Sequence, residues 1–256
     1  MAGKGRSPAY SDAMSLDRLT AIMRRLRDPD TGCEWDRVQT FTTIAPYTIE
    51  EAYEVADAID RGDLDGLADE LGDLQLQVVF HAQMATEAGQ FTLDDVLGRI
   101  CDKLERRHPH IFSDAATSPG WEALKAAERS KSPDSSALAG VALALPALER
   151  ANKLQKRAAR TGFDWPDASG ARAKVIEELA ELDAETDQAA REEELGDLLF
   201  AVVNLARKLN IEPEFALRAA NAKFERRFRH IETAPGFDAL SLEEKEALWV
   251  EAKSAV

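Results

Sequence analysis

Residues 69–79 read DELGDLQLQVV, and residues 193–203 read EELGDLLFAVV. Both stretches contain Glu-Leu-Gly-Asp followed by an apolar run, so each carries a glutamate and an aspartate three positions apart. Residues three or four apart share one face of an α-helix, and the two carboxylates of each stretch therefore point in one direction. The apolar residues that follow have the same helical spacing. The pattern predicts an amphipathic helix with an acidic end, and it predicts that helix twice.

A second acidic motif, Glu-Glu-x-x-Glu, precedes each of these stretches, at residues 50–54 and 177–181. Two helices that pack with these motifs side by side bring four or five carboxylates to one place. Carboxylates that close repel one another strongly unless a cation lies between them. Pairing with basic residues does not explain the set, because few basic residues follow these acids at i+4. A divalent metal ion is the simplest explanation, and the repetition argues against chance.

Other sequence motifs also occur once in each half, in the same order. A Thr-Gly-x-acidic-Trp loop occurs at residues 31–35 and 161–165, and Lys-x-Glu-Arg-Arg occurs at residues 103–107 and 223–227. A repeat of this length indicates duplication of a whole domain. The periodicity is helical nearly throughout, so we expect an all-α fold of two tandem homologous helical bundles, each of about four helices. The expected ranges are 1–15 for a loose N-terminal tail, 16–130 and 138–256 for the two domains, and 131–137 for the linker.

Local signals predict where individual helices begin and end. Pro46 and Thr48 indicate a helix start, with Thr48 as the N-cap of a capping box that Glu51 completes. This reading gives Glu51 a local role that needs no metal, although the equivalent glutamate of the second half is expected inside a helix. Residues 62–63, Gly-Asp, and residues 89–90, Gly-Gln, predict helix ends.

Length, charge and cysteine usage limit the functions that are expected for this chain. The chain has 256 residues and a formal net charge of −15, which argues against binding of a nucleic-acid polymer. A nucleotide substrate remains open, because metal ions reverse the local sign of charge. Cys33 and Cys101 stand outside any C-x-x-C pair, so no disulfide framework or zinc site is expected, and a reducing cytoplasm fits.

No apolar run approaches the roughly 20 residues that a membrane-spanning helix needs, so we expect no membrane association. Each domain offers few helices to cover its own apolar faces. We therefore expect these faces to be buried against the other half of the chain or against a second chain, and a homodimer is the expected assembly.

Clustered carboxylates without histidine or cysteine favour Mg²⁺, with Mn²⁺ as a substitute. Magnesium held in this way commonly binds phosphate oxygens. Lys223 shares a helix face with Arg226 and with Arg227, so these three residues are positioned to grip the far end of a polyphosphate. A cationic surface turn is the structural alternative for this basic motif.

Together these motifs resemble the MazG family of nucleoside triphosphate pyrophosphohydrolases. The resemblance covers nearly the whole chain and rests on GCEWDRVQTFTTIAPYTIEEAYEV, DELGDLQLQVVFHAQMA, KLERRHPHIF, EEELGDLLFAVVNLARKL and NAKFERRFR. It implies the all-α pyrophosphohydrolase bundle that is shared with dimeric dUTPases and phosphoribosyl-ATP pyrophosphohydrolases. It also implies Mg²⁺-dependent hydrolysis of (d)NTPs to (d)NMP and pyrophosphate, in control of the nucleotide pool.

The resemblance assigns four metal ligands to each half. They are Glu178, Glu181, Glu194 and Asp197 in the second half, and Glu51, Glu54, Glu70 and Asp73 in the first. Glu178 and Glu181 are the candidates for the base that activates water, although the sequence does not separate ligand from base. Lys223 and Arg227 are expected to stabilise the leaving pyrophosphate.

The two halves differ where a nucleoside needs polar contacts. Asn204 lies seven residues after Asp197 on the same helix face, and the equivalent residue of the first half is Phe80. Asn221 likewise corresponds to Cys101. We therefore expect the C-terminal domain to be the principal hydrolase, with two equally active sites as the alternative.

The expected substrate-binding residues all lie in the second half. They are Lys153, Trp165, Asn204, Asn221, Lys223, Arg226, Arg227 and Trp249. Trp165 either stacks on a base or anchors its own loop. Trp249 either closes over the site or docks the C-terminal segment.

Two other enzyme classes and one non-catalytic class are the alternatives to this hydrolase. Residues 191–196, REEELG, resemble part of a Nudix box, but the longer R-E-x-x-E-E-x-G frame and a mixed α/β fold are missing. The sequence lacks G-x-x-x-x-G-K-[ST], which excludes a P-loop NTPase. A non-catalytic helical interaction module is the alternative from a different class, and it predicts no dependence on metal.

Overall fold

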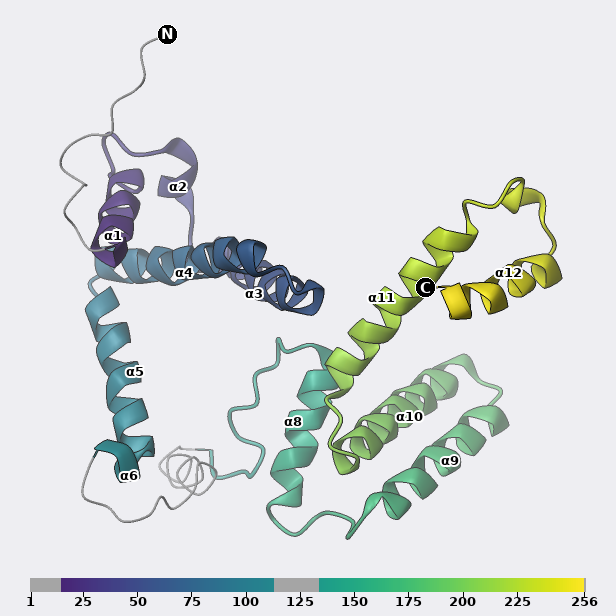
Figure 1. The fold of residues 1–256 in the computed structure, drawn as a ribbon. Coiled ribbons are helices and arrows are strands. Elements are labelled where there is room, and N and C mark those ends of the chain that lie inside the picture. Colours follow the sequence, from purple (N-terminus) through teal and green to yellow (C-terminus); the bar gives the residue numbers. More distant parts are fainter. Residues whose placement is uncertain (1–14, 113–133, 256) are drawn as a thin grey trace. The chain divides into compact units, whose positions relative to one another are not determined.

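The computed structural model describes residues 15–112 and 134–255 (Figure 1). These residues form α-helices and one 3-10 helix and contain no strand, which confirms the predicted all-α fold. Within them, no helix has both the length and the apolar character that crossing a membrane requires.

The chain divides into two compact units, Met1–Leu124 and Lys125–Val256. The expected N-terminal tail lies outside the described residues except for Ser15, and the expected linker is described only from Asp134 onward. The exact boundaries of the domains therefore stay predictions.

The first unit is built on a hairpin of two long helices that lie side by side (Figure 1). A connection of two residues, Gly62 and Asp63, makes α3 and α4 antiparallel, and α1 packs against α4. In chain order the helices are α1 (Ser15–Leu26), α2 (Glu34–Val38), α3 (Phe41–Arg61), α4 (Leu64–Glu87), α5 (Leu93–Arg107) and α6 (Pro109–Phe112). The core of the unit consists of Met23, Ile44, Val79, Phe80 and Met84.

The second unit repeats this order of elements. A first helix, α8, packs on α10, and α9 and α10 form the hairpin that corresponds to α3 and α4. The elements are α8 (Ala147–Ala159), α9 (Ala168–Ala184), α10 (Gln188–Lys208), α11 (Pro213–Ile231), η2 (Phe237–Ala239) and α12 (Leu242–Ala255). The same succession of helix, loop, hairpin and further helix in both units agrees with the predicted tandem repeat.

The predicted helix ends are confirmed. Gly62 caps α3 with φ of 68°, a left-handed conformation that favours glycine, and its N–H donates to the carbonyl groups of Ala58 and Ile59. Asp63 then caps the N-terminus of α4 by accepting a hydrogen bond from the Gly66 N–H at 2.9 Å. After α4, Gly89 has φ of 65°.

The predicted helix start at Pro46 and Thr48 is wrong. Helix α3 begins at Phe41, and Pro46 lies inside it. Thr40 forms the capping box with Thr43, so Glu51 is free of the capping role. The Thr48 hydroxyl instead donates to the Ile44 carbonyl at 3.4 Å, as a residue within a helix does.

Arg27 links the end of α4 to α2, the short helix that contains Trp35. Its guanidinium donates to the Glu87 carboxylate at 2.7 and 3.0 Å and to the carbonyl groups of Asp36 and Gln39 at 2.6 and 3.3 Å. The Arg27 side chain is only 8% exposed. Removing a largely buried charged donor leaves its acceptors unpaired, which destabilises a fold strongly.

We predict that Arg27→Met lowers the free energy of unfolding by about 2 kcal/mol, because the Glu87 carboxylate and the carbonyl groups of Asp36 and Gln39 lose the guanidinium donor. Urea unfolding followed by circular dichroism measures this change. Arg18→Met, at an exposed position of α1, is the matched control and should change the free energy by less than about 0.5 kcal/mol. Equal effects of the two substitutions would contradict this role for Arg27.

Candidate functional site

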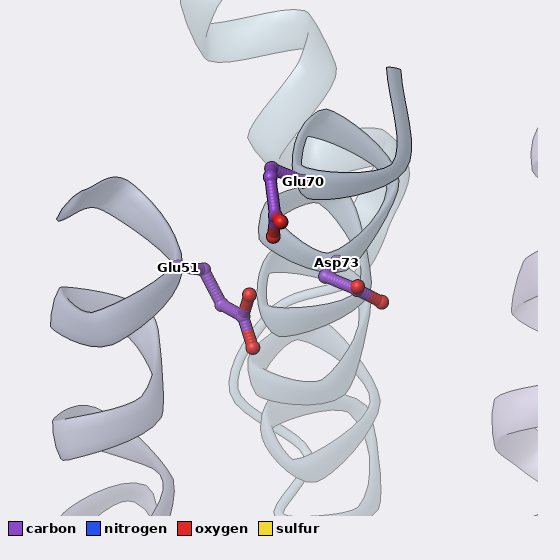
Figure 2. Close-up of side chains that lie close together, drawn as sticks. All are labelled: Glu51, Glu70 and Asp73. Carbon is purple, nitrogen blue, oxygen red and sulfur yellow. The ribbon is translucent and has the colours of Figure 1, made fainter. Parts of the chain in front are cut away.

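The first hairpin brings three carboxylates together. Figure 2 shows Glu51 projecting from α3 toward α4, which carries Glu70 and Asp73. One oxygen of each lies within 4.8 Å of the others. Burial raises the pKa of Glu51, and repulsion by Asp73 and Glu54 adds to the rise. Glu54, the fourth expected ligand, is therefore a close neighbour of this set, although it is not one of the three.

The second hairpin repeats this arrangement. Glu178 from α9 and Glu194 and Asp197 from α10 also place one oxygen each within 4.8 Å of one another. Glu178 is only 5% exposed. Burial raises the pKa of Glu194, and the charges of Glu181, Glu178 and Asp197 raise it further. Glu181, like Glu54 in the first unit, lies near the three carboxylates but is not one of them.

Lys174 is a functional candidate that the sequence reasoning missed. Its ammonium nitrogen lies 2.6 Å from Glu178 Oε1 and 2.7 Å from Glu177 Oε1. The hydrogen bonds to Glu177 and Glu178 raise the pKa of Lys174. Lys174 stands four positions before Glu178, whereas the absence of basic residues four positions after each acid was the signal taken from the sequence. Helical spacing in the N-terminal direction also predicts this pair.

A cavity of about 750 Å³ adjoins the second set of carboxylates. Glu178, Asp197, Lys174 and Asn204 belong to its wall. The apolar part of the wall includes Leu154, Ala158, Phe163, Trp165, Phe200 and Ala201. The structure thus brings the sequence candidates Asn204 and Trp165 to the same cavity as two expected metal ligands. A largely apolar cavity with a few polar groups at its wall suits a small ligand with a planar ring.

The loop that carries Trp165 is fixed to α10. Arg207 and Lys208 both bind the Asp164 carboxylate, and Lys208 also donates to the Trp165 carbonyl. The Arg207 guanidinium lowers the pKa of Asp164 to about 2. A Cβ atom on Gly170 would lie 2.3 Å from the Trp165 ring, so the indole packs directly on the backbone of α9. Trp165 is therefore a packing anchor that also lines the cavity.

The basic residues of α8 are paired elsewhere. Lys153 is exposed, and its Nζ lies 3.2 Å from Oε1 of Glu149, one turn earlier on the same helix. Lys156 donates to Glu212 at 2.7 Å. Neither residue lines the cavity, so a contact of Lys153 with substrate stays a prediction.

The candidates on α11 and α12 also lie outside this cavity. Helix α11 leads away from the α9–α10 hairpin toward α12 (Figure 1). The cavity wall includes none of the α11 candidates, which are Asn221, Lys223, Arg226 and Arg227. Trp249 packs against Phe224, with 5.3 Å between the ring centroids, and so docks the C-terminal segment on α11. Substrate contacts of these residues stay predictions.

Both sets of carboxylates fit a hard divalent cation. Each set offers oxygen ligands only. Burial raises the pKa values of Glu51, Glu70 and Glu194, and the charges of neighbouring carboxylates add to the rise. A cation bound between the carboxylates would remove this added repulsion.

Comparison with known proteins agrees with this geometry. Residues 39–112 and 172–232, more than half of the chain, match the MazG nucleotide pyrophosphohydrolase domain. The chain belongs to the MazG family. Each matched segment contains the hairpin helix that carries the Glu-x-x-Asp motif and the helix with the Lys-x-Glu-Arg-Arg motif.

MazG relatives span most of this chain. It is 52% identical to the nucleoside triphosphate pyrophosphohydrolase of Escherichia coli, over 93% of this chain and 97% of that protein. It is 48% identical to the nucleoside triphosphate pyrophosphohydrolase/pyrophosphatase MazG of Thermotoga maritima, over 90% of each. An uncharacterized protein of Bacillus subtilis is 46% identical over 91% of this chain, which covers 50% of that longer protein.

The anchored loop of this MazG chain leads to a prediction on stability and pH. The pKa of Asp164 is lowered to about 2 from 3.8, so the folded state favours its ionised form. The resulting stability is fully present above pH 3.8 and is lost as the pH falls toward 2. Because the Asp164 side chain is 22% exposed, solvent screening reduces the contribution to about 1 kcal/mol.

We therefore expect Asp164→Asn to lower the free energy of unfolding by about 1 kcal/mol at pH 7, and the difference from the unmodified chain to shrink between pH 4 and pH 2. Urea titrations at several pH values test this expectation. Asp183→Asn, at an exposed position of α9, is the control and should show a small difference. A difference for Asp164→Asn that stays constant with pH would refute the assignment.

Proposed function

We propose that this MazG chain hydrolyses (d)NTPs to (d)NMP and pyrophosphate with Mg²⁺, for which Mn²⁺ substitutes, and that the C-terminal unit holds the principal active site. The observation that carries the proposal is the cavity whose wall contains both Glu178 and Asp197 beside apolar side chains. The Escherichia coli and Thermotoga maritima relatives, named as nucleoside triphosphate pyrophosphohydrolases, support the reaction.

A comparison of equivalent positions in the two units favours the C-terminal unit as the principal hydrolase. At the positions that correspond to Ala201 and Asn204, it has Gln77 and Phe80. Phe80 is 3% exposed and belongs to the core of its unit, and Trp35 packs edge-on against it with 6.4 Å between the ring centroids. At these two positions the first unit therefore has larger side chains, whereas the second unit has a small residue, Ala201, and a polar one, Asn204. This favours nucleoside binding in the second unit.

In the proposed mechanism, bound Mg²⁺ would be held by the carboxylates of the second hairpin and would neutralise charge on the triphosphate. The side chains around it position the other groups. Glu178 would orient the attacking water, and its burial at the cavity wall and its ion pair with Lys174 support this role. Glu181 is the second candidate for the base, because burial, together with a hydrogen bond to Glu178, raises its pKa.

A homodimer is part of the proposal. The α9–α10 hairpin leaves apolar side chains exposed on consecutive helical turns, and a second copy of the chain would cover them. They are Ile176, Leu179, Leu195, Leu199 and Val202. A partner subunit would also bring further basic residues near a site whose own α11 candidates lie outside the cavity. A cytoplasmic location is expected as well, in agreement with the free thiols of Cys33 and Cys101.

The decisive activity experiment compares equivalent glutamates of the two units. Pyrophosphate release from a panel of triphosphates should fall at least about 100-fold in Glu178→Gln, because a group that orients or deprotonates water is lost. The matched variant Glu51→Gln should keep most of the activity, and a chelator should abolish turnover in both proteins.

Full turnover by Glu178→Gln would overturn the preference for the C-terminal unit. Turnover that survives complete removal of divalent metal would overturn the proposed metal dependence. A protein without any pyrophosphate release would support the non-catalytic interaction module.

The dimer prediction is tested by charge on the exposed apolar face. Leu179→Lys together with Leu199→Lys should halve the mass measured by light scattering after size exclusion, because buried lysines would repel one another across the interface. Exposed Leu143→Lys, in the segment before α8, is the control. An unchanged mass in the double variant would exclude this face as the interface.

A further inference from the structure

The orientation of the Asn204 amide is fixed by the chemistry of its partner. Its oxygen Oδ1 accepts hydrogen bonds from Arg207 Nε at 3.0 Å and from Arg207 Nη2 at 2.6 Å. A guanidinium has only N–H donors and no acceptor, so the amide nitrogen cannot take the place of the oxygen. The NH₂ group of Asn204 must therefore point away from Arg207. Within residues 15–112 and 134–255, no hydrogen-bond acceptor is bound to it.

Arg207 is itself held rigidly. Its Nη1 donates to Asp164 Oδ2 at 3.0 Å, and Nη2 donates to the other carboxylate oxygen, so the pair is bidentate. The Arg207 side chain is only 11% exposed. Because two edges of the guanidinium are engaged at once, it cannot turn without breaking the bonds to Asp164 or those to Asn204.

The NH₂ group of Asn204 is a donor at the wall of the cavity. Asn204 lines this cavity together with Trp165 and Phe200. Asn204 lies two helical turns after Asp197, a separation of about 10 Å along α10. A triphosphate held at the carboxylates would thus place its nucleoside, and not its phosphates, next to Asn204. Every common nucleobase presents ring nitrogens or carbonyl oxygens that accept hydrogen bonds.

We infer that Arg207 is a positioning residue that turns the Asn204 amide so that its NH₂ group donates a hydrogen bond to an acceptor atom of the nucleobase. This inference rests on the proposed function, in which the C-terminal cavity receives the nucleoside. It assigns to Arg207 a task in substrate recognition that it performs through Asn204, in addition to holding the Trp165 loop through Asp164. The cavity would then select for a ligand with a hydrogen-bond acceptor next to the Asn204 NH₂ group.

The test separates recognition of the base from recognition of the phosphates. Arg207→Met keeps the length of the side chain and removes its donors, so the amide is free to turn. We expect KM for a nucleoside triphosphate to rise about tenfold, which corresponds to the loss of about 1.4 kcal/mol, with kcat changed less than threefold. Inorganic tripolyphosphate has no base, so its inhibition constant should stay the same. Arg229→Met, whose arginine pairs with Glu225 on the exposed face of α11, is the matched control and should change neither constant.

Asn204→Asp provides a second variant in case Arg207→Met does not fold. Its carboxylate still accepts both hydrogen bonds from Arg207, but it has no donor for the base, so KM should again rise about tenfold. Because Arg207 acts on the base through Asn204, the effects of Arg207→Met and Asn204→Ala on KM should be clearly less than additive in the double variant.

Three results would overturn the inference. The first is an unchanged KM in Asn204→Asp. The second is an equal rise of KM and of the tripolyphosphate inhibition constant in Arg207→Met, which would indicate general damage to the site. The third is additive effects in the double variant. The Glu178→Gln variant separates these results from a failure of the proposed function. If Glu178→Gln loses turnover, the KM values report on the C-terminal cavity and the three results overturn the inference; if it keeps full turnover, the proposed function fails instead.

Discussion

Repulsion between carboxylates is the constraint on which the rest of this structure depends. Each hairpin packs two acidic helices against each other, and the oxygen atoms of three side chains meet within 4.8 Å. The tight connection between α3 and α4 and the capped entry of α10 at Asp187 keep the helices in register against this repulsion. Lys174 offsets part of the charge in the second hairpin. The helices before and after each hairpin then supply apolar surface that holds the acidic face in place.

The sequence alone predicted most of this architecture. The repeat was visible because Glu-x-x-Asp and the apolar run after it depend only on neighbours within one helix. The helix end at Gly62 was equally local, since a residue that readily adopts positive φ is needed there. The start of α3 was predicted at Pro46 because proline usually stands in the first turn of a helix. The true signal was the Thr40–Thr43 pair, which caps the helix from further upstream.

The cavity was less predictable, because its wall comes from segments that are distant in the chain. The position of Asn204 on the face of Asp197 follows from helical spacing. The bond from Arg207 to Asp164 joins residues 43 positions apart, and nothing in either motif indicates it. For α11, helical spacing predicts that Lys223 shares a face with Arg226 and with Arg227. Spacing within one helix does not tell where that helix leads, so the contacts of these residues with substrate stay predictions.

The aromatic side chain of Phe80 limits what the first unit can accommodate at this position. It corresponds to the cavity residue Asn204 and at the same time packs with Met23, Ile44 and Val79 in the core of its unit. Replacing it with asparagine would leave a void and a buried amide, at a cost of about 3 kcal/mol or more. A polar side chain at this position would therefore weaken the core of the first unit before it opened a pocket there.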